Sequence, residues 1–218
     1  HTYLPEPVLR ERCIELLNVE DIALSPAIET LIDTEEIVAE YAEGSDLRLL
    51  FWKPLWRAEV NAADHVERIC RSPRRFRPRS IEHHLEEVES ELGFELALAQ
   101  RRAVRTAWTR KMCVITGGPG TGKTTIVRAV CELGSALGQR VALAAPTGRA
   151  ANRLGEATGR TAKTVHRLLE FSWSDGGFQL NAANPMDVDM LILDEASLLD
   201  TFLVAAIVAA LPSRAALL

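Results

Sequence analysis

The 218-residue sequence has few of the features that mark several large classes of protein. Its four cysteines are far apart in the chain and lack the paired spacing of a zinc site or a disulfide-rich scaffold. Aromatic residues make up only 6% of the chain. The longest apolar stretch, Thr201–Leu211, is far shorter than the roughly 20 residues that a membrane-spanning helix requires. No signal segment and no internal repeat are evident, so we expect no membrane association.

The remaining composition is typical of a globular protein, with 47% hydrophobic and 25% charged residues. The cysteines Cys13, Cys70, Cys113 and Cys131 lie in apolar stretches, and we expect them to be buried free thiols in a reducing cytoplasm. The first residue is His1 rather than Met, so we expect a processed or cut piece of a longer protein.

The net charge of −5 hides a difference between the two halves. Residues 1–99 carry 11 basic and 21 acidic side chains, whereas residues 100–218 carry 14 basic and 9 acidic ones. The acidic total therefore does not exclude a polyanionic partner for the second half.

The first 50 or so residues predict two helices followed by a hairpin. Apolar residues recur at helical spacing within Val8–Leu17, and Ser25 followed by Pro26 is typical of the start of a second helix. Glu36–Ala42 and Leu47–Trp52 flank a four-residue turn signal. This pattern predicts a winged-helix-like module, whose acidity favours a spacer over a DNA-binding unit.

A linker separates this module from the rest of the chain. An amphipathic helix from Pro54 to about Arg71 completes the module, which we assign to residues 1–72. Four arginines and two prolines in 72–79 predict a solvated basic linker, with a phosphate contact as the alternative. Glu82–Glu95 predicts an acidic helix with a solvated face, and together these segments fill residues 73–99.

From Gln100 onward, short apolar runs alternate with helical segments. Continuously apolar strands separated by helices predict an α/β fold with a parallel sheet covered on both faces. We expect a polar surface excursion at Ser172–Pro185. The expected strands are Met112–Thr116, Val141–Ala145 and Val188–Leu193, and the expected helices are Lys123–Leu137, one ending at Leu154, Thr164–Phe171 and Leu198–Leu211.

Gly117–Thr124 matches the phosphate-loop pattern G-x-x-x-x-G-K-[ST], between a predicted strand and a predicted helix. Such glycines let successive backbone N–H groups face one phosphate, and the following helix directs its positive dipole end at the same anion. Lys123 offers a charge for the β- and γ-phosphates, and the Thr124 hydroxyl suits Mg²⁺. The alternative is a glycine-rich structural turn. The other predicted phosphate-binding residues are Gly118, Pro119, Gly120, Thr121 and Gly122.

An apolar strand ends in two carboxylates, Asp194 and Glu195. A buried parallel strand delivers such residues to the carboxyl edge of the sheet, where the phosphate loop also lies. There Asp194 can hold Mg²⁺ through water, and Glu195 can deprotonate an attacking water. Together, the loop and the acidic strand end predict a nucleoside triphosphatase.

Four segments resemble the RecD-type superfamily 1 DNA helicases, which include the exodeoxyribonuclease V alpha subunit and its stand-alone relatives. The resemblance is close over roughly residues 96–218 and implies a RecA-like P-loop domain at residues 100–218. The segments are Gly117–Thr125 (GGPGTGKTT), Ala145–Ala151 (APTGRAA), Thr164–Leu169 (TVHRLL) and Asp194–Leu199 (DEASLL).

The resemblance also implies roles for single residues. Gln100 falls where these helicases recognise adenine, whose edge requires both a donor and an acceptor. Thr125 falls in the nucleotide loop, and His166 has the alternative of being a packed helical histidine. The residues implied to bind single-stranded DNA are Pro146, Thr147, Arg149 and His166.

The resemblance implies that ATP, with Mg²⁺, drives translocation along single-stranded DNA, 5′ to 3′, and so unwinds duplex. It also implies a cytoplasmic enzyme and other recombination or repair subunits as partners. The alternatives are the helicase half of a conjugative relaxase and a non-catalytic ATP-binding scaffold. Residues 214–218 look like the start of another strand, so we expect a domain truncated before its second motor domain and inactive alone.

Overall fold

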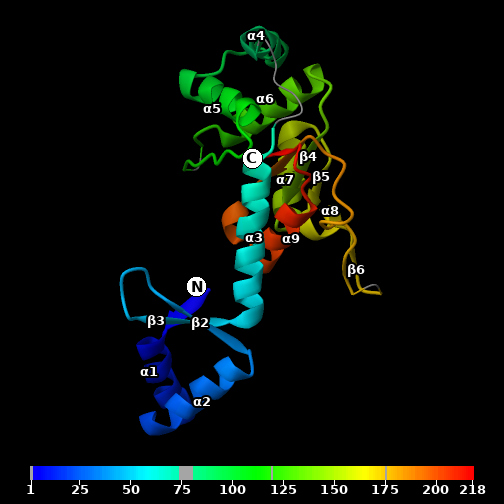
Figure 1. The fold of residues 1–218 in the computed structure, drawn as a ribbon. Coiled ribbons are helices and arrows are strands. Elements are labelled where there is room, and N and C mark those ends of the chain that lie inside the picture. The colour runs from blue at the N-terminus through cyan, green and yellow to red at the C-terminus, as the bar shows by residue number, and fades with distance from the viewer. Residues whose placement is uncertain (1, 74–80, 119, 175) are drawn as a thin grey trace. The chain divides into compact units, whose positions relative to one another are not determined.

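The computed structural model describes residues 2–73, 81–118, 120–174 and 176–218. The chain divides into two compact units, residues 1–63 and 64–218. The division falls within helix α3 (Lys53–Arg71), earlier than the boundary expected at residue 72. Figure 1 labels the elements of both units.

The first unit contains two helices and a three-stranded antiparallel sheet of order β1-β3-β2. The predicted hairpin is confirmed as β2 and β3, whereas the pairing of β1 with β3 was not predicted from the sequence. The elements are β1 (Tyr3–Pro5), α1 (Glu6–Leu17), α2 (Asp21–Asp33), β2 (Ile37–Tyr41) and β3 (Arg48–Trp52).

The predicted start of the second helix at Ser25 was wrong, because α2 begins at Asp21 and contains Pro26. Proline lacks one backbone N–H, so this helix forgoes one intrahelical hydrogen bond near its amino end. Leu24 and Ile28, on either side of the proline, are buried with Leu50 in the core of this unit. Their burial explains why the helix continues through the proline.

The second unit is built on a parallel four-stranded sheet of order β5-β4-β8-β9, flanked by helices. This arrangement confirms the predicted α/β class. The elements after α3 are α4 (Ile81–Leu92), α5 (Leu98–Thr109), α6 (Lys123–Ala136), β4 (Val141–Ala145), α7 (Gly148–Thr158), β5 (Ala162–Thr164), α8 (Val165–Leu168), β6 (Phe171–Ser172), β7 (Gly177–Phe178), β8 (Met190–Leu193), the 3₁₀ helix η1 (Ala196–Leu198), α9 (Thr201–Ala210) and β9 (Ala216–Leu217).

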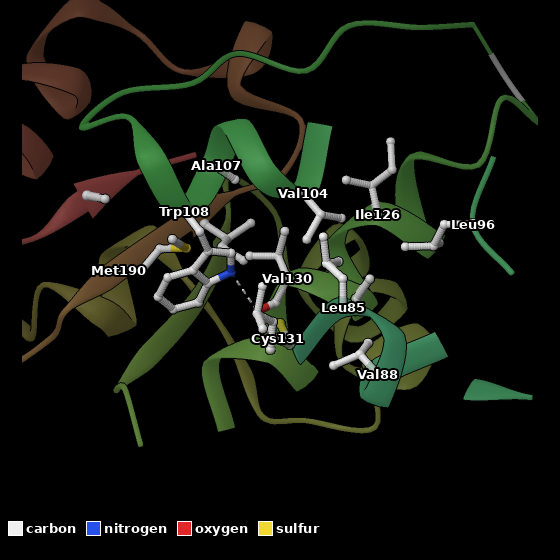
Figure 2. Packing of buried hydrophobic residues seen from close by; sticks show 14 of the residues in the cluster. Leu85, Val88, Leu96, Val104, Ala107, Trp108, Ile126, Val130, Cys131 and Met190 are labelled. Atoms are coloured by element: carbon white, nitrogen blue, oxygen red, sulfur yellow. Dashed lines mark hydrogen bonds between the residues drawn. The ribbon is translucent and has the colours of Figure 1, made fainter. Parts of the chain in front are cut away.

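The main core of this unit packs α4, α5 and α6 against one face of the sheet (Figure 2). Trp108 of α5 is 2% exposed, and its Nε1 donates a hydrogen bond to the Val130 carbonyl of α6 at 3.3 Å. Met190 and Ile192 of β8 face this cluster. Leu191 between them points to the other face and is also fully buried, so both faces of the strand are covered.

Two local predictions were wrong. Met112–Thr116 forms a single parallel bridge between Met112 and Leu217 instead of a strand, and Val114 is 83% exposed. The predicted helix Thr164–Phe171 is reduced to the one turn of α8, because strands β5 and β6 take the residues on either side of it.

The acidic helix α4 also differs from expectation, since one of its faces is buried in the main core. Leu85 and Val88 are almost completely buried there, and Glu89 is only 7% exposed. The acidic residues on the other face remain solvated, as the charge run predicts. The helix is therefore a structural part of the second unit.

The amino edge of the parallel sheet is held by a network of ion pairs. Asp189, just before β8, has a 9% exposed side chain and accepts hydrogen bonds from the Arg140 backbone N–H at 3.0 Å and from its Nε at 3.2 Å. Asp187 pairs with both Arg140 and Arg214, which precede β4 and β9. Backbone bonds from Asp189 and Met190 to the Arg140 carbonyl complete this edge.

All four cysteines are free, but only Cys131 is buried, so the expectation of buried thiols was wrong for the others. Burial raises the pKa of Cys131 to about 11, whereas Cys70 is exposed on α3. Within the described residues, no helix has the length and apolarity needed to cross a membrane.

Candidate active site

The phosphate loop precedes α6 at the carboxyl edge of the sheet and adopts a backbone that requires glycine. Gly120 and Gly122 have φ angles of +74° and +82°, in the left-handed region that side chains disfavour. A Cβ atom on Gly117 would lie 2.6 Å from Thr121 Oγ1, so this position also has no space for a side chain. The loop geometry therefore accounts for Gly117, Gly120 and Gly122. A Cβ atom on Gly118 would meet no atom within 4 Å.

Gln100, the predicted adenine-recognition residue, lies beside this loop. A Cβ atom on Gly122 would come within 2.3 Å of Gln100 Nε2, so the two residues are in direct contact. The Gln100 Oε1 accepts a hydrogen bond from the backbone N–H of Ala97 at 3.0 Å, which fixes the side chain at the start of α5. Thr125 Oγ1 lies near the same point of the loop.

Glu89 supports the segment that carries Gln100, and sequence reasoning missed it. Its Oε1 accepts a hydrogen bond from the Leu96 backbone N–H at 2.8 Å, and its Oε2 lies 3.6 Å from Arg101 NH1. A buried carboxylate needs such partners, because an unpaired charge in the core is costly. Glu89 was missed because it belongs to a run of acidic residues that suggests a solvated face. Only the periodic apolar residues of α4 indicated which face of the helix is buried.

Lys123, the first residue of α6, folds back over the loop. Its Nζ donates hydrogen bonds to the carbonyl oxygens of Gly117 and Gly118, the latter at 2.9 Å. Thr124 follows it on the first turn of the helix, where its side chain is exposed. The free N–H groups and positive dipole end of this turn favour an anion beside both residues.

Asp194 and Glu195 follow β8 at the same edge. Asp194 Oδ1 accepts a hydrogen bond from the Glu195 backbone N–H at 3.0 Å, and Glu195 has a left-handed backbone with φ +52°. A non-glycine residue in this region costs of order 1–3 kcal/mol and is often found at functional sites. The carboxylate of Glu195 lies 3.8 Å from Arg153 of α7.

These elements enclose a cleft of about 960 Å³. Pro119 lies outside the described residues, so its prediction has no structural counterpart here. Arg153, which sequence reasoning did not single out, also lines the cleft; its spacing of four residues from Arg149 was the available signal. The predicted site residues that line the cleft together are Gly118, Gly120, Thr121, Gly122, Lys123, Thr124, Asp194 and Glu195.

The donor atoms of the cleft fit a nucleotide with Mg²⁺. The Thr124 hydroxyl and the Asp194 carboxylate are oxygen ligands, which Mg²⁺ prefers, and it commonly binds one or two protein groups together with phosphates. Within the described part of the chain, no group of three or more His, Cys, Asp or Glu side chains is arranged to hold a metal alone. The donor set is thus suited to a metal that arrives with phosphates.

Pro146, Thr147 and Arg149 are not among the residues that line the cleft. Pro146 and Thr147 connect β4 to α7, and Arg149 is the second residue of α7. Figure 1 labels both elements. Thr147 caps α7 by accepting a hydrogen bond from the Ala150 backbone N–H at 3.2 Å. Thr147 and Arg149 are exposed. A capped helix start with an exposed guanidinium is suited to contacts with a phosphate backbone, as predicted, but no geometry tests that role.

His166 lies on α8 and does not line the cleft. Its ring centroid is 6.0 Å from that of Phe171 and 5.8 Å from that of Phe178, so it packs with the β6–β7 hairpin. Trp173 of the same hairpin is 90% exposed and contacts Phe171 edge to face at 5.0 Å. The packing alternative for His166 therefore has structural support, while its exposed position leaves the DNA role a prediction.

The sequence was compared with known families and proteins. The AAA domain family matches residues 100–218. The chain is 50% identical over 108 residues to the ATP-dependent RecD2 DNA helicase of Deinococcus radiodurans, which covers 50% of this chain and 15% of that protein.

Two further relatives bear the name RecBCD enzyme subunit RecD. That of Mycolicibacterium smegmatis is 37% identical over 137 residues, covering 52% of this chain and 24% of the relative. That of Haemophilus influenzae is 33% identical over 142 residues, covering 51% and 21%. This chain therefore spans at most about a quarter of the length of these three relatives.

Proposed function

From the premise that this chain belongs to the AAA domain family, we propose that residues 100–218 are the nucleotide-hydrolysing core of an ATP-dependent DNA helicase. The observation that carries the proposal is that Lys123, Thr124, Asp194 and Glu195 line one cleft beside a phosphate loop. The printed names of the RecD and RecD2 relatives support DNA as the substrate.

Each residue of the cleft has a chemical role in this proposal. Lys123 and the loop N–H groups bind the phosphates, and Gln100 at the neighbouring helix start reads adenine. Thr124 and Asp194 hold Mg²⁺, which would neutralise phosphate charge during transfer. Glu195 accepts a proton from the attacking water, for which its exposed carboxylate at the rim of the cleft is suited.

In this proposal DNA binding involves the amino end of α7, whose Ala150 and Arg153 also line the cleft. Arg149 and the amino end of the helix offer a cation and free N–H groups to the phosphate backbone, and Pro146, Thr147 and His166 contribute nearby. In the whole enzyme, hydrolysis drives 5′ to 3′ translocation on single-stranded DNA and duplex unwinding. The enzyme acts in the cytoplasm, alone or with recombination or repair subunits.

The test is steady-state phosphate release by the longest natural open reading frame that contains this chain. We expect single-stranded DNA to stimulate release and Lys123→Ala to abolish it. Strand displacement from duplexes with 5′ or 3′ tails measures polarity. Nucleotide binding without hydrolysis, with or without DNA, would instead support the non-catalytic scaffold.

The DNA contacts are tested separately by the salt dependence of binding. Arg149→Ala should weaken binding to all single-stranded sequences alike and reduce the slope of log K against log salt by about 0.7. A loss confined to particular sequences would indicate base recognition and contradict the assignment of Arg149 to phosphate contacts.

A further inference from the structure

Arg153 is a cleft-lining residue that the proposed nucleotide and DNA contacts leave without a role. It lies one helical turn after Arg149 on α7, and its NH1 is 3.8 Å from Glu195 Oε1. Among the described residues, it is the one cation within ion-pair distance of that carboxylate. The phosphate loop lines the same cleft, so Arg153 shares one cleft with both the proposed proton acceptor and the proposed phosphate site.

The ion pair between Arg153 and Glu195 is weak, so a more strongly bound anion can replace it. Their side chains are 70% and 37% exposed, and exposed ion pairs contribute little to stability. Among the described residues, Glu195 is the one carboxylate within ion-pair distance of the Arg153 guanidinium, whereas Arg140 is held by two aspartates. A phosphate offers a stronger partner, because its oxygens accept two parallel bonds from a guanidinium.

The charges that line the cleft favour such a move. Lys123 is turned toward the carbonyl oxygens of Gly117 and Gly118, whereas Asp194 and Glu195 contribute negative charge to the same cleft. A nucleoside triphosphate adds further negative charge next to Glu195. Among the described residues, Arg153 is the other cation that lines the cleft, and its side chain is 70% exposed.

We propose that Arg153 exchanges partners with the nucleotide state: it pairs with Glu195 in the nucleotide-free protein and with the terminal phosphate when a triphosphate is bound. The exchange frees the Glu195 carboxylate only when the group to be hydrolysed is present. Arg153 is thus a sensor of the terminal phosphate. This inference rests on the proposed function, since it assumes that the cleft binds a nucleoside triphosphate.

Calorimetric binding of Mg·ADP and of a non-hydrolysable Mg·ATP analogue to the 218-residue chain tests the exchange. Arg153→Ala should weaken binding of the analogue about tenfold, as expected for one charge-assisted bond, and change ADP affinity less than about twofold. Arg153→Lys should recover part of the loss. Arg128→Ala is the matched control, because Arg128 is an exposed arginine of α6 that does not line the cleft.

The outcomes separate this inference from the proposed function. Equal losses for both nucleotides, or no loss, would overturn the sensor role, while the phosphate-loop assignment stands if Lys123→Ala weakens binding of both about 100-fold. If the unaltered chain binds neither nucleotide, both proposals are wrong. Circular dichroism of each variant verifies that it is folded.

A second variant tests the competition itself. Glu195→Gln removes the carboxylate but keeps the side-chain shape, so it should raise affinity for the ATP analogue a few-fold. The gain should be smaller in the Arg153→Ala background, where no guanidinium remains to be released. An equal or larger gain in that background would show simple charge repulsion and overturn the exchange.

Discussion

The two edges of the parallel sheet are built from the same strands and yet differ in almost every physical respect. At the amino edge, Arg140, Asp187, Asp189 and Arg214 neutralise one another, and backbone hydrogen bonds join the strand starts. At the carboxyl edge, the backbone is left-handed at Gly120, Gly122 and Glu195. Lys123 donates to carbonyl oxygens of the loop, and Glu195 forms an ion pair of 3.8 Å with the largely exposed Arg153. The amino edge satisfies its charges, whereas the carboxyl edge keeps them available.

This difference shows how one sheet separates stability from chemistry. Strand direction sends the carboxyl ends of all four strands to one edge, so functional groups collect there and can be spared from structural duties. The opposite edge then supplies the ion pairs that hold the strands together. Substitutions at the two edges should therefore affect different measurements.

The largest effect is expected at the carboxyl edge, on turnover. In the longest natural chain, Glu195→Gln should lower phosphate release by about 10²- to 10⁴-fold, because it removes the group that accepts the proton of the attacking water. Nucleotide binding should be retained. Rapid-quench and equilibrium-binding measurements separate the two, and unchanged turnover would mean that another group is the base.

Lys123→Ala should give the next largest effect, a loss of nucleotide affinity of about 100-fold, since the ammonium group makes charge-assisted contacts to more than one phosphate. Its present partners are loop carbonyls, so the free energy of unfolding should barely change. Calorimetry and urea denaturation report the two quantities. A large loss of stability with unchanged nucleotide affinity would show that Lys123 has a structural role and does not bind the nucleotide.

At the amino edge the expected effect is on stability. Asp189→Ala should lower the free energy of unfolding by about 2 kcal/mol, because it removes a mostly buried partner of Arg140 and Arg214, both still partly solvated. Asp187→Ala is the control: its side chain is 76% exposed, so the loss should stay below about 1 kcal/mol. Neither variant should change nucleotide affinity. A change in affinity would show that the ion pairs of the amino edge influence nucleotide binding at the carboxyl edge.

The smallest expected effect is an increase in the free energy of unfolding. Glu195→Gly should stabilise the fold by about 0.5 kcal/mol, since relief of the left-handed side chain exceeds the entropy that glycine adds to the unfolded chain. Thermal unfolding measures this shift. Destabilisation would show that the ion pair with Arg153 contributes more than the backbone conformation costs.

The elements that local signals specify could be predicted from the sequence, and those that depend on distant partners could not. Strand β4 has its predicted bounds, because its five residues are apolar and are followed by a helix cap. Met112–Thr116 does not form the predicted strand, because its pairing with β9 is limited to one bridge, between Met112 and Leu217. Sequence periodicity cannot report the availability of such a partner.

The candidate site divides in the same way. The phosphate loop and the acidic strand end could be recognised together in the sequence, because their combined residue types predict nucleotide chemistry, and the structure brings both to one cleft. Glu89 and Arg153 were missed, because each acts through a residue far away in the sequence: Glu89 through Leu96 and Arg101, and Arg153 through Glu195. An ordinary charged helix face and a functional one look alike until the fold brings their partners into contact.

The left-handed backbone of Glu195 has a consequence for sequence drift. Selection for folding alone would favour glycine at this position, and selection for hydrolysis alone would favour a carboxylate on a side chain long enough to reach water. A library of variants at position 195, sorted once for abundance and once for turnover, should therefore enrich different amino acids. Comparing the amino acids enriched in the two sorts would show whether the glutamate at position 195 is favoured by folding or by hydrolysis.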